Sequence, residues 1–451
     1  MKLTINKLTQ YLNTNNPSEE QVGLLTISID TRQITPANPA IYFAIVGERL
    51  DGHAFIDQAI SNGAEVLVVN NGYEVNGRKG LFLFVEDTQK ALGQVAAGIR
   101  RDSKIPWVGV TGSAGKTTTR RFISDLLSIK GPVLETIANN NNQIGVPLTI
   151  FNLEENHQFA VIEAGTNHCG EIDYLANIIK PDIAVITNIG PTHIEFLGSV
   201  EGVAKEKSSL FVHLKPDGKA IFNIETRCVD FVKNIAGKRL ISYGLNSGDV
   251  KPEKTMELAN STVLIIDGTT LEIPFKGDHY ISNFLAAVVV ARQLGLTWDE
   301  IARASKGIKT IHGRLDVLLE SPIYLIDDSY NASFDSMIAA FQVLNHLPKR
   351  GKKIAVLGDM RELGDEKIRY HQELVVQLNK CQFDLVLVSG ECWSQVISGY
   401  KGKYFIGLNI GEMVLLCNSN IQQSDQILVK ASRSLQFDLV AKSIFQSWKD
   451  Q

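Results

Sequence analysis

The most constraining feature of the sequence is a glycine-containing loop between an apolar run and an amphipathic run. Trp107–Val110 predicts a buried strand, and Thr118–Ile129 predicts the helix after the loop. Between them stands Gly-Ser-Ala-Gly-Lys-Thr, whose glycines let backbone N–H groups and the helix N-terminus face a phosphate. Lys116 supplies positive charge for the β- and γ-phosphates, and the Thr117 hydroxyl suits Mg²⁺. The loop predicts ATP binding, and by itself leaves kinase, ATPase and ligase open.

Short apolar runs alternate with helix-compatible stretches along most of the chain, which predicts an α/β fold with mostly parallel sheets. Runs that are apolar on both faces suit strands covered on both sides by helices. The predicted strands are Trp107–Val110, Phe159–Glu163, Ile183–Ile189, Ile323–Asp327, Lys353–Leu357, Leu385–Val388 and Gln426–Lys430. The predicted helices include Thr118–Ile129 and Ser336–Leu347.

The length of 451 residues exceeds one ordinary hydrophobic core, so we expect several domains. The alternation divides into blocks at residues 1–84, 85–313 and 314–451. The central block carries the phosphate loop, and the third begins near the segment IYLIDDSYNAS.

Composition excludes several classes of protein. The formal charge of −4 lacks the basic excess of a nucleic-acid binder. No run approaches the roughly 18 to 20 apolar residues of a membrane span, and the polar start lacks the pattern of a secretory signal. The five scattered cysteines include no CxxC pair, which fits a reduced, cytoplasmic protein.

Polar side chains follow two further predicted strands. Glu163 ends one apolar run, and Asn188 and His193 follow another. Because ligands gather at the carboxyl ends of strands in open α/β sheets, we expect these side chains near Lys116. Glu163 is a suitable Mg²⁺ ligand, whereas His193 could be a ligand or an ordinary histidine.

Two other segments stay ambiguous on their residues alone. Lys205 and Lys207 lie on a predicted helix and read most simply as solvated lysines. The polar cluster NNNNQ, at residues 139–143, precedes a strand-like segment. It could be a turn with side-chain hydrogen bonds or a surface that holds a polar substrate.

Taken together, several segments resemble the Mur ligase family, in the order that the family shows. They are TGSAGKTTT, NNNNQIGVP, EAGTNHCGEI, TNIGPTHIEFLGSVEGVAKEK and DDSYNAS, and the similarity runs from Ile29 to Lys442. NNQIGVP and GDMRELG favour the member that adds D-Ala-D-Ala to UDP-N-acetylmuramoyl-tripeptide in peptidoglycan precursor synthesis. The resemblance implies an ATP- and Mg²⁺-dependent amide ligase that forms an acyl-phosphate.

The same resemblance implies a domain for each substrate. Residues 1–84 would form a small α/β domain for the UDP-sugar-peptide. Residues 85–313 would form an ATP-binding P-loop domain with a doubly wound, mostly parallel sheet. Residues 314–451 would form a Rossmann-like α/β domain for the incoming D-Ala-D-Ala. We expect a monomer.

Site residues carry over from the family motifs one by one. Lys116, Lys207 and His193 match the groups that carry the chemistry, and Lys207 matches a lysine that relatives hold as a metal-binding carbamate. The expected metal ligands, for two Mg²⁺ ions, are Thr117, Glu163, His193 and carbamylated Lys207. The expected nucleotide contacts are Gly112, Ser113, Ala114, Gly115, Lys116, Thr117, Thr118, Asn283, Arg314, Asp328 and Tyr330. The expected contacts of the UDP-muramoyl-peptide are Thr31, Arg32, Gly47, Arg49, Asp51, His53, Asn139, Asn141 and Asn142.

The sequence departs from the family motifs at a few positions. Tyr280 replaces the asparagine of an HN pair, Phe334 a proline, and Ala431 the glycine of KGSR. Ser209 stands where many dipeptide-adding members carry glutamate. None of these departures removes a group that the chemistry needs.

Three alternatives compete with this interpretation. A sister ligase would add a single amino acid, but the DNPR motif of the diaminopimelate-adding enzyme is absent. A P-loop kinase or NTPase switch would use Lys116 and Thr117 and leave Lys207 and His193 without a role. A non-catalytic binding protein is contradicted by the intact set of expected catalytic residues.

Overall fold

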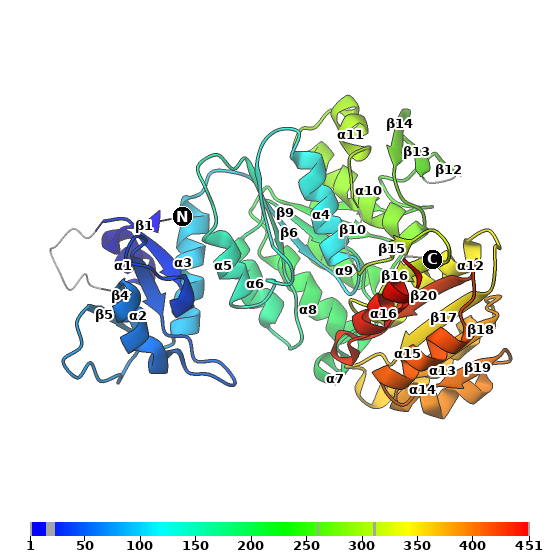
Figure 1. Cartoon of the computed structure of the whole chain (residues 1–451). Coiled ribbons are helices and arrows are strands. Elements are labelled where there is room, and N and C mark those ends of the chain that lie inside the picture. Colours follow the sequence, from blue (N-terminus) through cyan, green and yellow to red (C-terminus); the bar gives the residue numbers. More distant parts are fainter. Residues whose placement is uncertain (1, 15–22, 259–260, 310–312, 450–451) are drawn as a thin grey trace.

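The computed structural model describes residues 2–14, 23–258, 261–309 and 313–449. Three α/β units follow one another along the molecule, and each consists of a sheet with the helices that cover it (Figure 1). We call them the N-terminal, central and C-terminal layers. Among the helices of these residues, none combines the length and apolar character that a membrane span requires.

The N-terminal sheet has five strands in the order β1-β2-β3-β4-β5, and only the β1–β2 pair is antiparallel. Its strands are β1 Lys2–Leu3, β2 Leu25–Ser28, β3 Ala40–Phe43, β4 Ala64–Asn70 and β5 Leu81–Val85. The helices are α1 Ile5–Leu12, η1 Thr31–Gln33, η2 Gly52–Phe55, α2 Ile56–Asn62 and α3 Thr88–Asp102. The predicted division after residue 84 falls inside β5, whose ladder with β4 continues to Val85.

The central sheet has six parallel strands in the order β11-β10-β9-β6-β8-β7. They are β6 Trp107–Thr111, β7 Val133–Glu135, β8 Phe159–Glu163, β9 Ile183–Ile186, β10 Lys219–Asn223 and β11 Leu240–Tyr243. The helices are α4 Lys116–Leu127, α5 Gly145–Ile150, α6 Glu171–Ile179, α7 Ile194–Leu197, α8 Val200–Val212, α9 Val229–Ala236, η3 Gly237–Arg239, α10 Asp278–Gln293 and α11 Trp298–Ser305. Strand order reverses on either side of β6, and such a switch point opens a ligand crevice at the strands' carboxyl ends.

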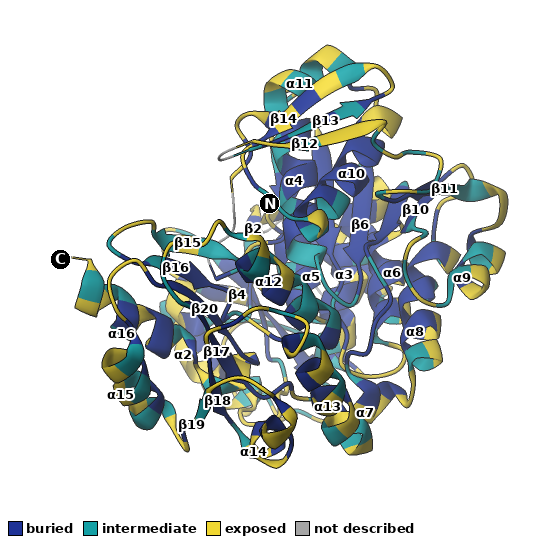
Figure 2. Cartoon of the chain, turned by 90° about the vertical axis from the view of Figure 1, so that its right-hand side faces the viewer, coloured by how far each residue is buried: buried dark blue, intermediate teal, exposed yellow. Residues whose placement is uncertain are grey.

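A small antiparallel sheet flanks the central layer, with β12 Lys254–Glu257, β13 Thr262–Ile266 and β14 Thr269–Ile273. One apolar face of this sheet packs with α4 and α10 on the central sheet in a single hydrophobic cluster. Helix α10 is therefore buried along most of its length, as Figure 2 shows.

The C-terminal sheet has six strands in the order β15-β16-β20-β17-β18-β19, and only the β15–β16 pair is antiparallel. They are β15 Asp316–Leu319, β16 Tyr324–Asp327, β17 Lys353–Gly358, β18 Leu385–Ser389, β19 Tyr404–Ile406 and β20 Gln426–Lys430. The helices are α12 Phe334–His346, η4 Gly364–Glu366, α13 Lys367–Leu378, α14 Glu391–Val396, η5 Ile397–Gly399, α15 Ile410–Asn420, η6 Arg433–Leu435 and α16 Asp438–Trp448.

Apolar side chains of strands and helices pack into hydrophobic clusters within the layers and between two of them. A continuous cluster joins the N-terminal sheet to one face of the central sheet, because Leu92, Val95 and Ile99 of α3 belong to it. Two separate clusters cover the two faces of the C-terminal sheet. Alternating residues of β17 enter opposite clusters, as the period of two in a strand requires.

Most sequence predictions of regular structure are confirmed. The seven predicted strands are present, although β9 ends at Ile186 rather than at residue 189. The prediction of a strand-like segment after NNNNQ is wrong, because Gly145–Ile150 forms helix α5. Asn142 Oδ1 accepts hydrogen bonds from the N–H groups of Ile144, at 3.2 Å, and Gly145, at 2.8 Å. These bonds stabilise the start of the helix, and Pro147 is tolerated in its first turn.

Candidate active site

The phosphate loop joins β6 to α4 at the carboxyl end of the central sheet. Gly115 precedes the helix at φ +78°, and a Cβ there would lie 2.3 Å from Asn283 Oδ1, so only glycine fits. No side chain caps this helix, so its first N–H groups remain available to an anion. Lys116 Nζ donates to the carbonyl of Gly112 at 2.8 Å, and burial lowers its pKa.

A cavity of about 980 Å³ opens in front of this loop, between the central and C-terminal sheets. Most of the expected catalytic and nucleotide-binding residues line it. They are Ser113, Ala114, Gly115, Lys116, Thr117, Thr118, His193, Asn283, Arg314, Asp328 and Tyr330. Gly112, Glu163 and Lys207 lie outside the lining, as do the expected contacts of the UDP-muramoyl-peptide.

Arg314 connects the phosphate loop to the first strands of the C-terminal sheet. Its Nη2 donates to Thr117 Oγ1 at 3.0 Å, and its guanidinium carbon lies 4.4 Å from the ring centre of Tyr330. The hydroxyl of Tyr280 donates to the backbone carbonyl of Arg314. Tyr280, one of the departures from the family motifs, therefore fixes the arginine that lies over the loop.

Glu163 ends β8 as a carboxylate that is 2% exposed. Its Oε1 accepts a hydrogen bond from Asn141 Nδ2 at 2.9 Å. Its Oε2 has no hydrogen bond and lies 3.5 Å from Arg120 Nε. Because a buried carboxylate oxygen without a hydrogen bond is costly, this atom is available to a cation; the predicted role of Glu163 as a metal ligand stays a prediction.

His193 lies in the loop after β9, at a left-handed φ of +54°. Its Nδ1 lies 2.5 Å from Oε2 of Glu362, which comes from the C-terminal layer. Burial is the main cause that lowers the pKa of His193; Glu362 opposes this shift, and the charges of Lys207 and Lys116 add to it. A neutral imidazole whose Nδ1 faces a carboxylate leaves Nε2 free to bind a metal.

Lys207 lies on α8 and is 1% exposed, whereas Lys205 on the same helix is exposed. Its ammonium group has no hydrogen bond or ion pair to any residue within the described ranges. Burial lowers its pKa well below the usual value, and the charge of Lys116 lowers it further. The solvated reading of Lys207 is therefore wrong, because the side chain is buried beside the site.

The polar cluster at residues 139–143 lies beside Glu163 and outside the cavity. Asn141 binds Glu163, and its backbone N–H donates to the carbonyl of Asn139 at 2.8 Å. Asn142 Oδ1 accepts the N–H groups of Ile144 and Gly145 just before α5, which is the turn with side-chain hydrogen bonds that the sequence allows. Gln143 accepts from Gln89 of α3 at 2.5 Å, which ties this segment to the N-terminal layer.

The expected UDP-contacting residues lie in the N-terminal layer, where several of them stabilise turns. Arg32 forms an ion pair with Asp30 at 2.7 Å, and Thr31 Oγ1 donates to Gln58 at 3.1 Å. His53 Nε2 accepts the N–H of Asn70 at 3.0 Å, so its Nδ1 carries the proton towards Asp51, at 2.7 Å. Gly47 donates to the carbonyl of Leu50 at 2.9 Å, and Arg49 is exposed.

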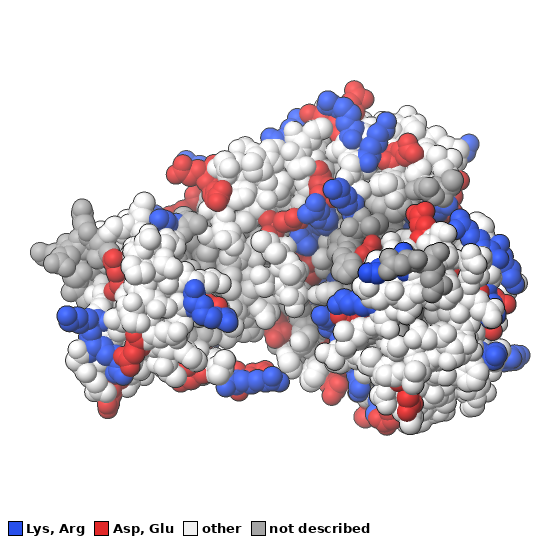
Figure 3. All heavy atoms as spheres, in the orientation of Figure 1, with Lys and Arg blue, Asp and Glu red and all other residues white. Residues whose placement is uncertain are grey.

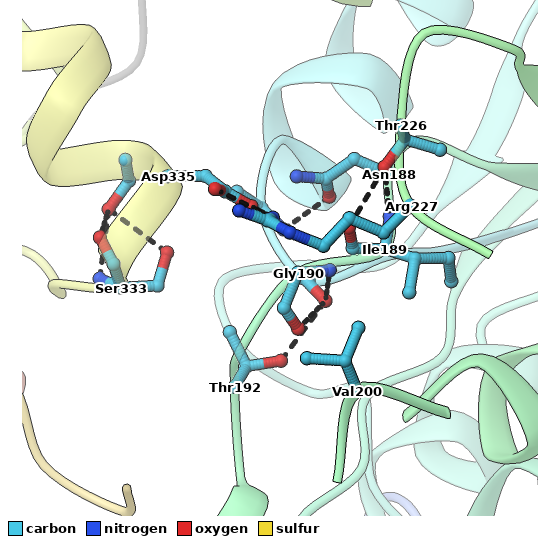
Figure 4. Close-up of polar contacts among 12 residues, drawn as sticks. Asn188, Ile189, Gly190, Thr192, Val200, Thr226, Arg227, Ser333 and Asp335 are labelled. Atoms are coloured by element: carbon cyan, nitrogen blue, oxygen red, sulfur yellow. Dashed lines mark hydrogen bonds and ion pairs between the residues drawn. The ribbon is translucent and has the colours of Figure 1, made fainter. Parts of the chain in front are cut away.

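Sequence reasoning missed a second connection between the central and C-terminal layers. Arg227 Nη1 donates to both carboxylate oxygens of Asp335, at 2.9 Å each, and Figure 4 shows the two side chains facing each other. Ser113 of the phosphate loop accepts from Gly190 at 2.9 Å and from the Thr192 hydroxyl at 3.1 Å. Nothing in the spacing of these residues predicts that they meet.

The C-terminal contribution to the cavity also includes Met360, Glu362 and Lys430. Lys430 Nζ donates to Asp328 at 2.6 Å and to the carbonyl of Asn331 at 3.0 Å. The motif GDMRELG contains Glu362, but its residues alone give no sign that this carboxylate reaches His193.

The remaining departures from the family motifs are accommodated by packing. Phe334 packs against Tyr370 with ring centres 5.2 Å apart, and Ala431 is fully buried. Ser209 donates to the carbonyl of Lys205 at 3.5 Å, so it adds no charge beside Lys207.

Charged side chains of both signs occur in small groups over the face shown in Figure 3. Blue and red groups stand close together around the central hollow of that face.

Comparison with family profiles matches three consecutive parts of the chain. Residues 25–100 match the "Mur ligase family, catalytic domain", and residues 110–291 match the "Mur ligase middle domain". Residues 313–433 match the "Mur ligase, glutamate ligase domain".

Individual relatives match over nearly their whole length. The chain is 35% identical over 438 residues to a UDP-N-acetylmuramoyl-tripeptide–D-alanyl-D-alanine ligase of Synechocystis, covering 96% of this chain and 94% of the relative. It is 33% identical to the enzyme of the same name in Escherichia coli, with 98% of each chain covered.

Solved structures agree with the arrangement of the layers. A crystal structure of MurF from Acinetobacter baumannii superimposes with a TM-score of 0.91 at 30% identity and covers 99% of both chains. MurF ligase from Thermotoga maritima in complex with ADP gives a TM-score of 0.83 at 27% identity, with 94% of this chain and 98% of that chain covered.

Proposed function

The chain belongs to the Mur ligase family, and we infer that it joins D-alanyl-D-alanine to UDP-N-acetylmuramoyl-tripeptide in peptidoglycan synthesis. The observation that carries this function is the consistent name of relatives that match over nearly the whole chain. The geometry agrees, because a phosphate loop faces a large cavity closed by a second α/β layer. If the chain were an NTPase switch, the second α/β layer would have no function in binding or catalysis.

The chain binds ATP in this cavity. Lys116 and the N-terminus of α4 face the phosphates, and Arg314 lies over Thr117 from the other side. Support comes from the relative of Thermotoga maritima, which was crystallised with ADP. Asn283, Asp328 and Tyr330 complete the proposed nucleotide site from the cavity wall.

The reaction has two steps. An oxygen of the peptide carboxylate attacks the γ-phosphorus of ATP, the bond to ADP breaks, and an acyl-phosphate forms. The amine of D-Ala-D-Ala then attacks the acyl carbon, inorganic phosphate leaves, and the amine loses a proton. Both reactants of the first step are anions, so Lys116 contributes by neutralising negative charge and by positioning the phosphate.

Residues on both sides of the phosphate loop fit a divalent cation. Thr117 and Glu163 suit one Mg²⁺, and His193 suits a second, since Oε2 of Glu163 lacks a hydrogen bond and Nδ1 of His193, which lies 2.5 Å from Glu362, is the ring nitrogen turned away from a metal at Nε2. Mg²⁺ supplies charge neutralisation on the transferred phosphoryl group. Glu163 keeps its position through Asn141.

Lys207 fits the carbamate that the family resemblance implies. A buried ammonium without a partner is costly, whereas a carbamate turns the same side chain into an oxygen ligand for a cation. The lowered pKa of Lys207 favours the neutral amine, which is the form that reacts with carbon dioxide.

The remaining assignments follow from the same membership. The N-terminal residues Thr31, Arg32, Gly47, Arg49, Asp51 and His53, with Asn139, Asn141 and Asn142, contact the UDP-muramoyl-peptide. The domains divide near residues 84 and 313, the protein is a monomer, and it acts in the cytoplasm.

Isotope transfer tests the mechanism directly. UDP-N-acetylmuramoyl-tripeptide labelled with ¹⁸O in the acceptor carboxylate is incubated with Mg-ATP and D-Ala-D-Ala. Through an acyl-phosphate, one labelled oxygen passes to each inorganic phosphate released, and mass spectrometry detects it. Unlabelled phosphate accompanying new UDP-pentapeptide would rule out this route.

A further inference from the structure

A contact between the central and C-terminal layers involves two residues in an unusual backbone conformation. His193 has φ +54° and Glu362 has φ +64°, although neither is glycine. Their side chains meet with Nδ1 of His193 2.5 Å from Oε2 of Glu362. Left-handed backbone at such residues is costly and persists where the surroundings enforce it, often at functional sites.

The loop that carries Glu362 is held within its own domain at each of the residues before it. The carboxylate of Asp359 accepts the N–H groups of Cys392, at 3.1 Å, and Trp393, at 3.0 Å. Met360 donates its N–H to Nε2 of the buried His371 at 3.1 Å.

The anchoring continues to the residue next to Glu362. Arg361 donates its N–H to Ser432 Oγ at 2.9 Å. The loop is thus fixed before it reaches the central domain, so Glu362 is presented in a defined position rather than by a mobile segment.

The buried group Asp359, His371 and Cys392 has the residue types of a metal site, but its atoms are already used. Nδ1 of His371 donates to the carbonyl of Lys367 at 2.7 Å, and its Nε2 accepts from Met360. Burial raises the pKa of the Cys392 thiol to about 11, which disfavours a thiolate ligand. This group therefore supports the loop.

We propose that Glu362 is a positioning residue that fixes the ring orientation and tautomer of His193 across the domain interface. The metal position at His193 is then complete only when the C-terminal domain is docked. Metal-bound histidines commonly donate their second N–H to a carboxylate. Here the carboxylate next to Nδ1 comes from another domain, at 2.5 Å but outside the angular range of a hydrogen bond. The assignment rests on the proposed function of the site, which makes His193 a metal ligand.

Further contacts place the segment that follows His193 against the loop that carries Glu362. The N–H of Glu195, two residues after His193, donates to the carbonyl of Glu362 at 3.3 Å. Gly364 has φ +54°, and a Cβ there would lie 3.1 Å from the Cα of Glu195. The backbones therefore approach closely, and this approach sets the distance between Glu362 and His193.

The test compares Glu362→Ala, Glu362→Gln and a matched control, Glu366→Gln. Glu366 pairs with Arg369 of its own domain at 2.5 Å, on the same stretch of chain, and lies outside the cavity lining. We expect Glu362→Ala to lower kcat about 10- to 100-fold with little change in the KM for ATP. Glu362→Gln keeps a hydrogen-bond acceptor and should lose less, and Glu366→Gln should match wild type.

A second readout does not depend on turnover. Nitrogen NMR of ¹⁵N-histidine-labelled protein with ADP and without Mg²⁺ reports the tautomer of His193, assigned with His193→Gln. Wild type and Glu366→Gln should show the proton on Nδ1, and Glu362→Ala a mixture of tautomers. Thermal unfolding checks that each variant is folded.

Unchanged His193 signals in Glu362→Ala would overturn the proposal, whatever its activity. Normal kcat in that variant would overturn it as well. Failure of the proposed function is recognised separately, because wild-type protein would then release no phosphate in response to D-Ala-D-Ala.

Discussion

Buried charged side chains lie near both the central and the C-terminal sheets, but the hydrogen-bond and ion-pair partners of these side chains differ. In the C-terminal sheet, Lys430 bonds to Asp328 and to a backbone carbonyl. Around the central sheet, Lys207 of α8 has no hydrogen bond or ion pair among the described residues, and Lys116 of α4 donates to the carbonyl of Gly112. Glu163 leaves one oxygen without a hydrogen bond, 3.5 Å from Arg120 Nε.

This difference separates unpaired side chains, which a ligand must compensate, from paired side chains, which also hold the structure around the site. A buried charge without partners costs stability, and it is retained where a ligand compensates it. A paired buried charge keeps a loop in place, and removing either partner leaves the other uncompensated. The comparison therefore predicts that removing an unpaired group costs activity but little stability, whereas removing one partner of the buried pair costs stability.

The largest expected effect is on turnover in Lys116→Ala. The variant should lose about 10³-fold or more in kcat, because the transferred phosphoryl group loses its nearest positive charge. Its free energy of unfolding should stay within about 1 kcal/mol of wild type, since no ion pair is broken. Phosphate release and urea unfolding measure the two quantities. A destabilised variant that keeps its activity would break the comparison.

A large loss of stability is expected for Lys430→Met. Asp328 would remain buried without its partner, and the protein should lose about 3 kcal/mol of unfolding free energy. The double variant Asp328→Asn with Lys430→Met should recover much of this loss in urea titrations. Lys442→Met removes an exposed lysine that pairs with Asp438 at 3.2 Å, and serves as the control. Equal stability of Lys430→Met and the control would refute the structural role of Lys430.

A smaller effect on turnover is expected for Lys207→Ala. Activity should fall about 100-fold, as is usual when support for a bound metal is lost. Short-chain carboxylic acids should restore part of it by supplying oxygen ligands in the space left. Lys205→Ala changes the exposed lysine of the same helix and should remain fully active. Activity of Lys207→Ala that is unchanged and insensitive to carboxylic acids would dismiss the carbamate.

The smallest effect concerns His279, which lies on the cavity wall near Lys430. Burial, followed by the charge of Lys430, lowers its pKa to about 4. The unfolded chain binds this proton from about pH 6.5 downwards, so stability falls as the pH drops towards 4. His279 should cost about 1 kcal/mol at pH 6 and about 2 at pH 5. His279→Phe should flatten this slope in urea titrations at several pH values, and a parallel slope would contradict the assignment.

Local pattern sufficed for much of the fold, and its failures have a physical origin. The apolar runs of β8 and β20 predict strands with the observed bounds, because a strand covered on both faces is a continuous apolar run. The segment at α5 was predicted as strand-like, because a short apolar run has no period that separates helix from strand. Just before this helix, the side chain of Asn142 accepts the N–H groups of Ile144 and Gly145, a contact that the apolar pattern does not reveal.

The candidate site likewise contains some residues whose role the sequence predicts and others whose contacts only the structure reveals. The phosphate loop is readable from residues alone, since its chemistry lies within a few consecutive positions. Lys207 could be assigned only by resemblance, because its burial follows from how α8 packs. The pair of His193 and Glu362 joins residues that are far apart in the sequence, and only the docking of two domains brings them together.

The most direct test of the account is phosphate release by the purified protein with Mg-ATP and UDP-N-acetylmuramoyl-tripeptide. D-Ala-D-Ala is compared with single amino acids as the second substrate, and the UDP-linked products are identified by mass spectrometry. The account predicts phosphate and a UDP-pentapeptide with D-Ala-D-Ala alone. Turnover with a single amino acid instead would contradict the assigned reaction and place the chain with the sister ligases of the family.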